Sequence, residues 1–305
     1  MSIAFFKKEV KFFQKIYSLF LQKIYTYTLF CGNIGMSYAR TILFERFIME
    51  NKIYLWENPP YIADTNNEFR PFIVPYEVND TKTAVIVIPG GGYGGKAGHE
   101  GEPIAKMFND GGINAFVLDY NVAKCNKFAP LSDVQRAIRT LRSMGYEKVA
   151  TLGFSAGGHL CCTSATLYDF EAYPKADEID ELSARPDAFM PCYPVVTFTE
   201  PFTHMGSRQN LLGEEKDDMY LVHMFSNEVN VTPNTPPCFI WHTANDGAVP
   251  VENSLMLADA LAKNKVYFEL HIYPDGCHGL GLASDRNDIS CWSKNAVIFL
   301  KNLGF

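Results

Sequence analysis

The sequence predicts an α/β fold in which a mostly parallel central sheet carries helices on both faces. Apolar, β-branched runs alternate with amphipathic stretches along the chain, which is the pattern of parallel strands joined by crossover helices. The chain has 305 residues, of which 47% are hydrophobic, and it contains no repeat or low-complexity tract. Without its unusual N-terminal stretch, this length suits one α/β domain with a full core.

The expected strands and helices alternate through the chain. We expect strands at Ile53–Leu55, Phe72–Val78, Ala84–Ile88, Ala115–Tyr120, Lys148–Gly153, Ala188–Val195, Cys238–Thr243 and Phe268–Tyr273. Helices are expected at residues 102–110, 133–144, 158–168, 251–263 and 290–303. The helix at 133–144 has the clearest signals, because Ser132 and Gln135 match a capping box and Gly145 follows its last turn.

Residues 1–48 differ from the rest of the chain. They hold seven Lys and Arg against two Asp and Glu, a balance of +5, whereas the remainder holds 20 against 32, a balance of −12. Lys15 and Lys23 interrupt the apolar run, which is too short for a transmembrane helix of about 20 residues and makes a poor signal peptide. The stretch is either an amphipathic helix on a membrane surface or, as we favour, sequence upstream of a start at Met49. We therefore expect residues 1–48 to be an extension outside the native fold and residues 49–305 to form the functional domain.

Composition and charge exclude several classes of partner. The acidic remainder argues against nucleic acid and against anionic membrane surfaces. No cluster of His and Cys has zinc spacing, so we expect no metal. We expect a cytoplasmic protein with reduced cysteines. The sequence does not decide whether it forms a homo-oligomer. The cysteines have no C-x-x-C or disulfide-like spacing; they stand at positions 31, 125, 161, 162, 192, 238, 277 and 291.

The strongest local signal surrounds Ser155. This residue is the centre of a G-x-S-x-G pentapeptide that directly follows the apolar run 148–152. Such a serine sits on a sharp turn from strand to helix, and the flanking glycines allow the strained backbone that exposes its hydroxyl. The helix that follows points its N-terminus at the same place. Because small residues also cluster by chance, this interpretation needs support from other motifs.

A glycine-rich run gives the first support. It directly follows the expected strand 84–88 and reads Pro89-Gly90-Gly91-Gly92-Tyr93-Gly94-Gly95. A tetrahedral oxyanion needs backbone N–H donors about 3 Å away, and glycines let the backbone approach that closely. The same run also matches the G-x-G-x-x-G of a phosphate-binding loop, but no helix starts directly after it and no acidic ribose ligand stands out. An oxyanion loop is therefore the favoured interpretation.

An acid and a base follow Ser155 along the chain. Asp246 lies in a turn after the expected strand 238–243, and His278 lies in a glycine-flanked loop after the strand 268–273. Of the seven histidines, only His278 falls on a strand-end loop beyond the acid. The rival acids Asp217 and Asp218 belong to a charged stretch that is typical of a solvated surface. We therefore predict a nucleophile, base and acid at Ser155, His278 and Asp246.

Together these motifs resemble the α/β-hydrolase esterases with a glycine-rich oxyanion loop, a branch that includes hormone-sensitive-lipase-like and bacterial acetyl-xylan-esterase-like enzymes. Segments 89–93, 100–105 and 116–120 are most similar to carbohydrate acetyl esterases of gut and rumen bacteria, and the resemblance runs from about Ile53 to Phe305. Pro89 stands where lipase-like members carry histidine, which brings the chain nearer to the acetyl esterases. The resemblance implies an α/β-hydrolase fold with a small cap insertion at about 197–237.

The resemblance also implies a function. It suggests that the amides of Gly91, Gly92 and Ala156 are the oxyanion donors. It also suggests a serine carboxylesterase that removes short acyl groups, above all acetyl, from a sugar or oligosaccharide. Such an enzyme works through an acyl-enzyme and needs no cofactor. Tyr93 and Tyr193 are candidates for contact with the substrate. The alternatives are an aryl formamidase or a general short-chain esterase or lipase. A peptidase is disfavoured because the length leaves no room for a gating domain, and a non-catalytic binding protein because all three catalytic residues are present.

Overall fold

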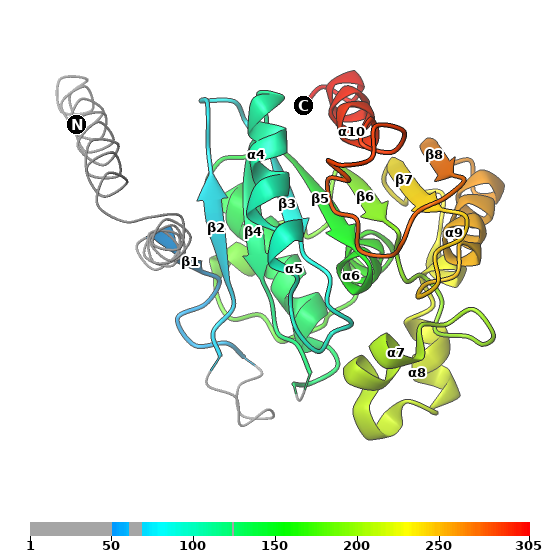
Figure 1. The fold of residues 1–305 in the computed structure, drawn as a ribbon. Coiled ribbons are helices and arrows are strands. Elements are labelled where there is room, and N and C mark those ends of the chain that lie inside the picture. The colour runs from blue at the N-terminus through cyan, green and yellow to red at the C-terminus, as the bar shows by residue number, and fades with distance from the viewer. Residues whose placement is uncertain (1–50, 61–68, 124) are drawn as a thin grey trace, which may run out of the picture. The chain divides into compact units, whose positions relative to one another are not determined.

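One sheet of eight strands forms the centre of the fold (Figure 1). The structure is a computed structural model that describes residues 51–60, 69–123 and 125–305, so the expected extension 1–48 lies outside the described residues. All eight expected strands are present, within a few residues of their expected bounds. They are β1 Ile53–Tyr54, β2 Phe72–Tyr76, β3 Thr83–Ile88, β4 Asn114–Asp119, β5 Lys148–Phe154, β6 Ala188–Cys192, β7 Cys238–Thr243 and β8 Phe268–Tyr273.

The sheet is mostly parallel, as predicted. Its strand order is β1-β2-β4-β3-β5-β6-β7-β8, and every neighbouring pair from β4 to β8 runs in parallel. Only β1 with β2 and β2 with β4 are antiparallel. The central strand β3 is buried on both sides, since its residues from Ala84 to Ile88 have no exposed surface. A sheet of this kind must be covered on both faces.

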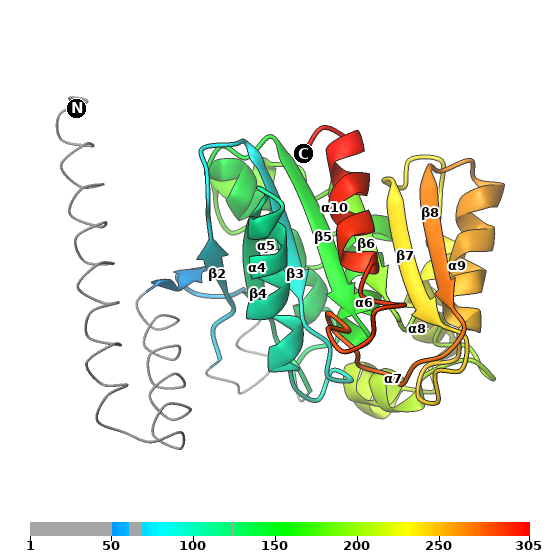
Figure 2. The same ribbon diagram turned by 45° about the horizontal axis from the view of Figure 1, so that its top comes forward.

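Helices provide that cover (Figure 2). On one face lie α4 (Glu102–Asp110) and α10 (Trp292–Asn302), where Val297 of α10 lies against Gly111 at the end of α4. On the opposite face α5 (Ala129–Ser143) packs against α6 (Ala156–Thr166), while α9 (Glu252–Lys263) packs on β7 and β8. Within the described part of the chain, no helix is both long and apolar enough to cross a membrane.

The helix α5 begins about one turn earlier than the sequence predicts. It starts at Ala129 with Pro130 in its first turn, where the missing N–H of proline costs no helical hydrogen bond. Ser132 therefore lies inside the helix, and its hydroxyl donates to the carbonyl oxygen of Phe128. The Gln135 amide donates to carbonyl groups of the segment after α6. The expected capping box is thus wrong, because other partners engage both side chains.

Short helices follow the end of β6. This strand ends at Cys192, earlier than expected, because Tyr193 has a φ of 35°, which is not an extended backbone conformation. The segment expected as a cap contains α7 (Met205–Leu212) and α8 (Met219–Met224), and Figure 2 shows α7 beside the carboxyl ends of the parallel strands. The 3-10 turns are η1 Gly98–Glu100, η2 Glu178–Glu181, η3 Gly213–Glu215 and η4 Asn227–Asn230.

Candidate active site

Ser155 occupies the tight turn between β5 and α6. Its backbone angles, φ 54° and ψ −117°, belong to a region that residues with a side chain rarely adopt. A Cβ atom on Gly153 would lie 2.1 Å from the carbonyl oxygen of Gly157, and a Cβ on Gly157 would lie 2.2 Å from that of Ile88. Both glycines of the G-x-S-x-G pattern are therefore required by packing. The Ser155 N–H is held by the carbonyl oxygen of Cys192 at 3.0 Å.

The Ser155 hydroxyl meets an imidazole and a carboxylate in one hydrogen-bonded chain. Nε2 of His278 lies 2.8 Å from Ser155 Oγ, and Nδ1 lies 2.7 Å from Oδ2 of Asp246. The Asp246 side chain is fully buried, whereas that of His278 is 23% exposed. Asp246 follows β7 and His278 follows β8, so the carboxyl ends of parallel strands bring both residues to the turn after β5. The structure thus joins the three predicted residues.

Backbone amides fix the orientation of Asp246. Its Oδ1 accepts the N–H groups of Ala248 at 2.8 Å and Val249 at 2.9 Å, which leaves Oδ2 for His278. Burial alone would raise the pKa of this carboxyl, but hydrogen bonds from His242, from His278 and from the two amides outweigh burial and lower the pKa below its usual range. The ionised carboxylate holds Nδ1 of His278 as a donor, and Nε2 is then free to accept the serine proton.

The glycine-rich loop after β3 turns back beside Ser155. A Cβ on Gly90 would lie 3.0 Å from the Cβ of Ser155, so the loop and the serine are in contact. Gly91 and Gly92 have φ angles of 137° and 63°, which favour glycine. Neither of their N–H groups donates to an acceptor within the described residues. These two amides, with that of Ala156 at the start of α6, stay the expected oxyanion donors.

Tyr93 and Tyr193 are buried, each with 1% of its surface exposed. The Tyr93 hydroxyl lies 2.8 Å from Nδ1 of His159 in the core, and the Tyr193 hydroxyl donates to Oε1 of Glu100 at 2.7 Å. Neither side chain is presented to a substrate. This placement corrects the expectation that both tyrosines contact the sugar, and its reason is that partners from distant segments engage both hydroxyl groups inside the protein.

The rival acids lie apart from the Ser155–His278 chain. The Asp217 carboxylate pairs with Arg208 and Lys216 and is 71% exposed. The Asp218 side chain accepts backbone N–H groups at the start of α8. Asp217 is therefore an exposed ion-pair residue and Asp218 is the N-cap of α8, in agreement with the surface location that their charged stretch predicts.

His204 is a residue of this site that the sequence does not single out. It caps α7, and its Nδ1 accepts the N–H of Ser207 at 3.2 Å, so in the neutral ring the proton lies on Nε2. Burial and the nearby His278 lower the pKa of His204, although Asp246 opposes them. Its Cε1 lies 4.0 Å from the place that a Cβ on Gly92 would take. The only signal in the sequence is its place in the polar cap segment.

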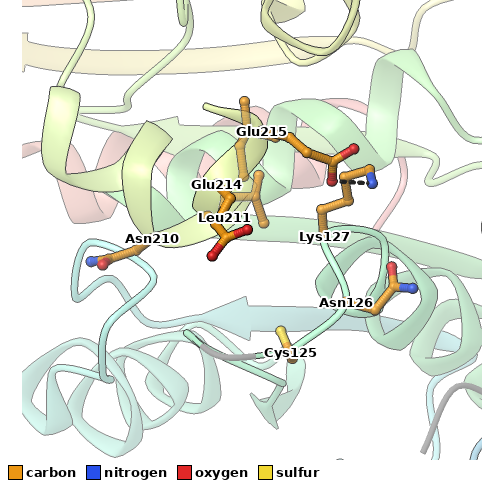
Figure 3. A pocket seen from close by; sticks show the side chains of 9 residues that line it. Cys125, Asn126, Lys127, Asn210, Leu211, Glu214 and Glu215 are labelled. Carbon is orange, nitrogen blue, oxygen red and sulfur yellow. Dashed lines mark hydrogen bonds and ion pairs between the residues drawn. The ribbon is translucent and has the colours of Figure 1, made fainter. Parts of the chain in front are cut away.

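A polar cavity adjoins the glycine-rich loop. Asn210 of α7 lines it and donates to the carbonyl oxygen of Gly92 at 2.9 Å, and an ion pair joins Lys127 and Glu215 across its wall (Figure 3). Its volume of about 670 Å³ lies in the range of small-molecule sites. The lining residues are Cys125, Asn126, Lys127, Asn210, Leu211, Leu212, Gly213, Glu214 and Glu215.

Within the described ranges, no three His, Cys, Asp or Glu side chains gather so that they could hold a metal ion. The cysteines of these ranges are free thiols, and Cys277, beside His278, is exposed.

The fold is that of the α/β-hydrolases. The chain belongs to the BD-FAE family, whose sequence model matches residues 72–261. It is 39% identical over 251 residues to the endo-1,4-beta-xylanase B of Butyrivibrio fibrisolvens, a match that covers 78% of this chain and 39% of that protein. It is 30% identical over 236 residues to the acetylxylan esterase of Xylanibacter ruminicola, covering 74% of this chain and 45% of that protein. The chain thus spans less than half the length of these two relatives.

Solved structures agree with the fold. The acetyl ester-xyloside bifunctional hydrolase from Caldicellulosiruptor lactoaceticus matches with a TM-score of 0.78 and 43% identity, covering 84% of this chain and 97% of that chain. The carboxylesterase Cest-2923 from Lactobacillus plantarum matches with a TM-score of 0.63 and 25% identity, covering 78% and 94%. The predicted fold and the resemblance to esterases of the carbohydrate acetyl esterase type are confirmed.

Proposed function

We propose that this chain is a serine carboxylesterase that removes acetyl groups from acetylated carbohydrates. The observation that carries the proposal is the hydrogen-bonded chain from Ser155 through His278 to the buried Asp246. It lies beside a loop whose amides at Gly91 and Gly92 are not used by other groups of the described chain. The substrate class is supported by relatives named acetylxylan esterase and acetyl ester-xyloside hydrolase.

In the proposed reaction, Oγ of Ser155 attacks the ester carbonyl carbon while Nε2 of His278 accepts the serine proton. The amides of Gly91, Gly92 and Ala156 donate to the oxyanion that forms. The imidazolium, stabilised by Asp246, then protonates the leaving sugar oxygen, and an acyl-enzyme is left. Water attacks this ester by the same steps, with the imidazole as base, and releases acetate and the free serine.

We propose a preference for acetyl over longer acyl chains. The short helices of the cap segment, α7 with eight residues and α8 with six, leave no long apolar helix to receive a fatty chain. The cavity beside the glycine-rich loop has amide and charged side chains among its lining residues, which can bind sugar hydroxyl groups. Because one methylene changes transition-state binding by only about 1–3 kcal/mol, the preference should be graded.

The test compares kcat/KM for p-nitrophenyl acetate, butyrate and octanoate with acetate release from acetylated xylo-oligosaccharides. Ser155→Ala should lose a factor of about 10⁴–10⁶ in kcat, because residues of this kind act as a unit. Activity of Ser155→Ala within about tenfold of wild type would overturn the mechanism. A maximum at octanoate with no acetate from any acetylated sugar would overturn the substrate class. An aryl formamide in the same panel tests the formamidase alternative.

A second candidate activity is the cleavage of xylosides. It is favoured by the 43% identical structure named an acetyl ester-xyloside bifunctional hydrolase. Glycosidic bonds are normally cleaved by two carboxyl groups that flank the bond. Two buried carboxylates near the serine turn, Asp246 and Glu100, are already engaged by hydrogen bonds, so we rank this activity second. Release of p-nitrophenol from its β-xyloside by Ser155→Ala would support a separate site for it.

A further inference from the structure

A buried carboxylate lies between the two loops that the proposed reaction uses. Glu100, in η1, is 2% exposed. Its Oε2 accepts the N–H of Gly90, at the start of the glycine-rich loop, at 2.7 Å, and its Oε1 accepts the hydroxyl of Tyr193 at 2.7 Å. Among the described residues, its one ion-pair partner is the mostly exposed His99, whose Nε2 lies 3.7 Å away and carries a charge only when the ring is protonated. Burying a carboxylate without a strong counter-charge costs several kcal/mol, so this residue suggests a role beyond stability.

Tyr193 extends the connection to the loop of His278. While its hydroxyl donates to Glu100, the same oxygen accepts the N–H of Gly281 at 2.8 Å. Its ring packs edge-on against the His278 imidazole, with centroids 5.1 Å apart and planes at 69°. The positive φ of Tyr193 is a strained conformation for a residue with a side chain, and such strain concentrates at functional sites.

Two further contacts join η1 and the residue before it to the same two loops. The N–H of Ala97 donates to the carbonyl oxygen of Gly90 at 2.8 Å. Nε2 of His99 lies 2.9 Å from the carbonyl oxygen of Gly279, the residue after His278. The segment 97–100 is thus joined to the glycine-rich loop on one side and to the histidine loop on the other.

We propose that Glu100 is a positioning residue that sets the glycine-rich loop and the His278 loop relative to Ser155, acting on the second loop through Tyr193. The inference rests on the proposed function. Glu100 touches no reacting atom, but hydrogen bonds to a charged acceptor are shorter and about twice as strong as neutral ones. A misplacement of about 1 Å at a reacting centre can cost about 100-fold in rate, so the two bonds should control turnover.

Glu100→Gln tests the role of the charge at constant size. Because the Gly90 N–H can only donate, the amide oxygen must face it, and the amide NH₂ then faces the Tyr193 hydroxyl, which loses its acceptor. We expect kcat for p-nitrophenyl acetate to fall about 10–100-fold, with KM within about threefold of wild type. The rate at which a phosphonate ester labels Ser155 should fall by the same factor. The matched control is Glu102→Gln, whose carboxylate pairs with Lys106 on the surface and whose change should leave both rates as in wild type.

Tyr193→Phe separates positioning from a purely structural role. It keeps the ring beside His278 but removes the hydroxyl, so we expect kcat to fall about tenfold. Because both changes break one connection, kcat of the double variant should equal that of Glu100→Gln alone, whereas independent effects would multiply. If the role is purely structural, the losses in the free energy of unfolding of the two single variants should add in the double variant. The kcat per folded molecule should then stay as in wild type.

Wild-type kcat in folded Glu100→Gln, with Ser155→Ala inactive, would overturn the positioning role alone. Retained activity in Ser155→Ala would overturn the proposed function itself. If Glu100→Gln does not fold, Tyr193→Phe decides, and a wild-type kcat in that variant would overturn the positioning role.

Discussion

Replacing Asp246 by Asn tests the electrostatic basis of the site. Oδ1 of Asp246 accepts two backbone N–H groups, from Ala248 at 2.8 Å and from Val249 at 2.9 Å. An Asn side chain must keep its carbonyl oxygen at this place, because its NH₂ group cannot accept those bonds. The NH₂ group then takes the place of Oδ2, which lies 2.7 Å from Nδ1 of His278.

This orientation changes the tautomer of His278. Nδ1 must now accept a hydrogen bond, so the proton moves to Nε2, and Nε2 can no longer take the proton of Ser155. We expect kcat to fall about 10⁴-fold, which corresponds to about 5.5 kcal/mol of lost transition-state stabilisation. The free energy of unfolding should fall by only about 1.5–3 kcal/mol, the range for one hydrogen bond to a charged group.

The assay is hydrolysis of p-nitrophenyl acetate at neutral pH, with urea unfolding as the measure of folding. Asp217→Asn is the matched control: its carboxylate is 71% exposed, so its kcat should stay within about twofold of wild type. Asp218→Asn should behave in the same way. A folded Asp246→Asn with kcat within about tenfold of wild type would refute the assignment of the acid.

Three further changes have defined outcomes. We expect the Nε2–H of His204 to donate to the sugar of the substrate. His204→Asn keeps an N-cap acceptor for α7 but removes this ring N–H, so kcat/KM should fall about tenfold for acetylated xylo-oligosaccharides and less for p-nitrophenyl acetate; equal losses would contradict the contact with the sugar. Burial lowers the pKa of His159 to about 4. As pH falls, the unfolded chain therefore takes up a proton near pH 6.5, before the folded chain does. The free energy of unfolding should fall as pH drops from about 6.5 to 4. In urea unfolding at several pH values, His159→Gln should show a smaller fall of the free energy of unfolding over this pH range. The same pH dependence as in wild type would contradict the role of His159. A chain without residues 1–48 should keep its activity and solubility, because every site residue lies at position 90 or beyond; failure to fold would contradict this expectation.

The parts of the site that are encoded locally could be predicted from the sequence. Packing requires glycine at Gly153 and Gly157, so the serine turn leaves a readable pattern. Asp246 and His278 each follow an apolar strand, and parallel strands bring their carboxyl ends to one edge of the sheet. Contact between these residues is therefore expected once the sheet is parallel, whereas the strand order comes from the structure.

The partners of buried polar groups could not be predicted. The hydroxyl of Tyr193 meets Glu100 from 93 positions away, and that of Tyr93 meets His159 from 66 positions away. The sequence shows that a residue is a tyrosine but not which group its hydroxyl meets inside the fold. Both tyrosines were therefore candidates for contact with a sugar. His204 has no local pattern, because its role depends on where α7 lies relative to the glycine-rich loop.

The claim that Ser155 is the nucleophile of an esterase is tested most directly by labelling the enzyme with a p-nitrophenyl phosphonate ester. We expect one label per chain, located by mass spectrometry on the peptide that contains Ser155. Esterase activity should fall in proportion to labelling, and Ser155→Ala should take up no label. A label on the exposed Cys277, or full hydrolysis of p-nitrophenyl acetate by an enzyme fully labelled at Ser155, would contradict the account.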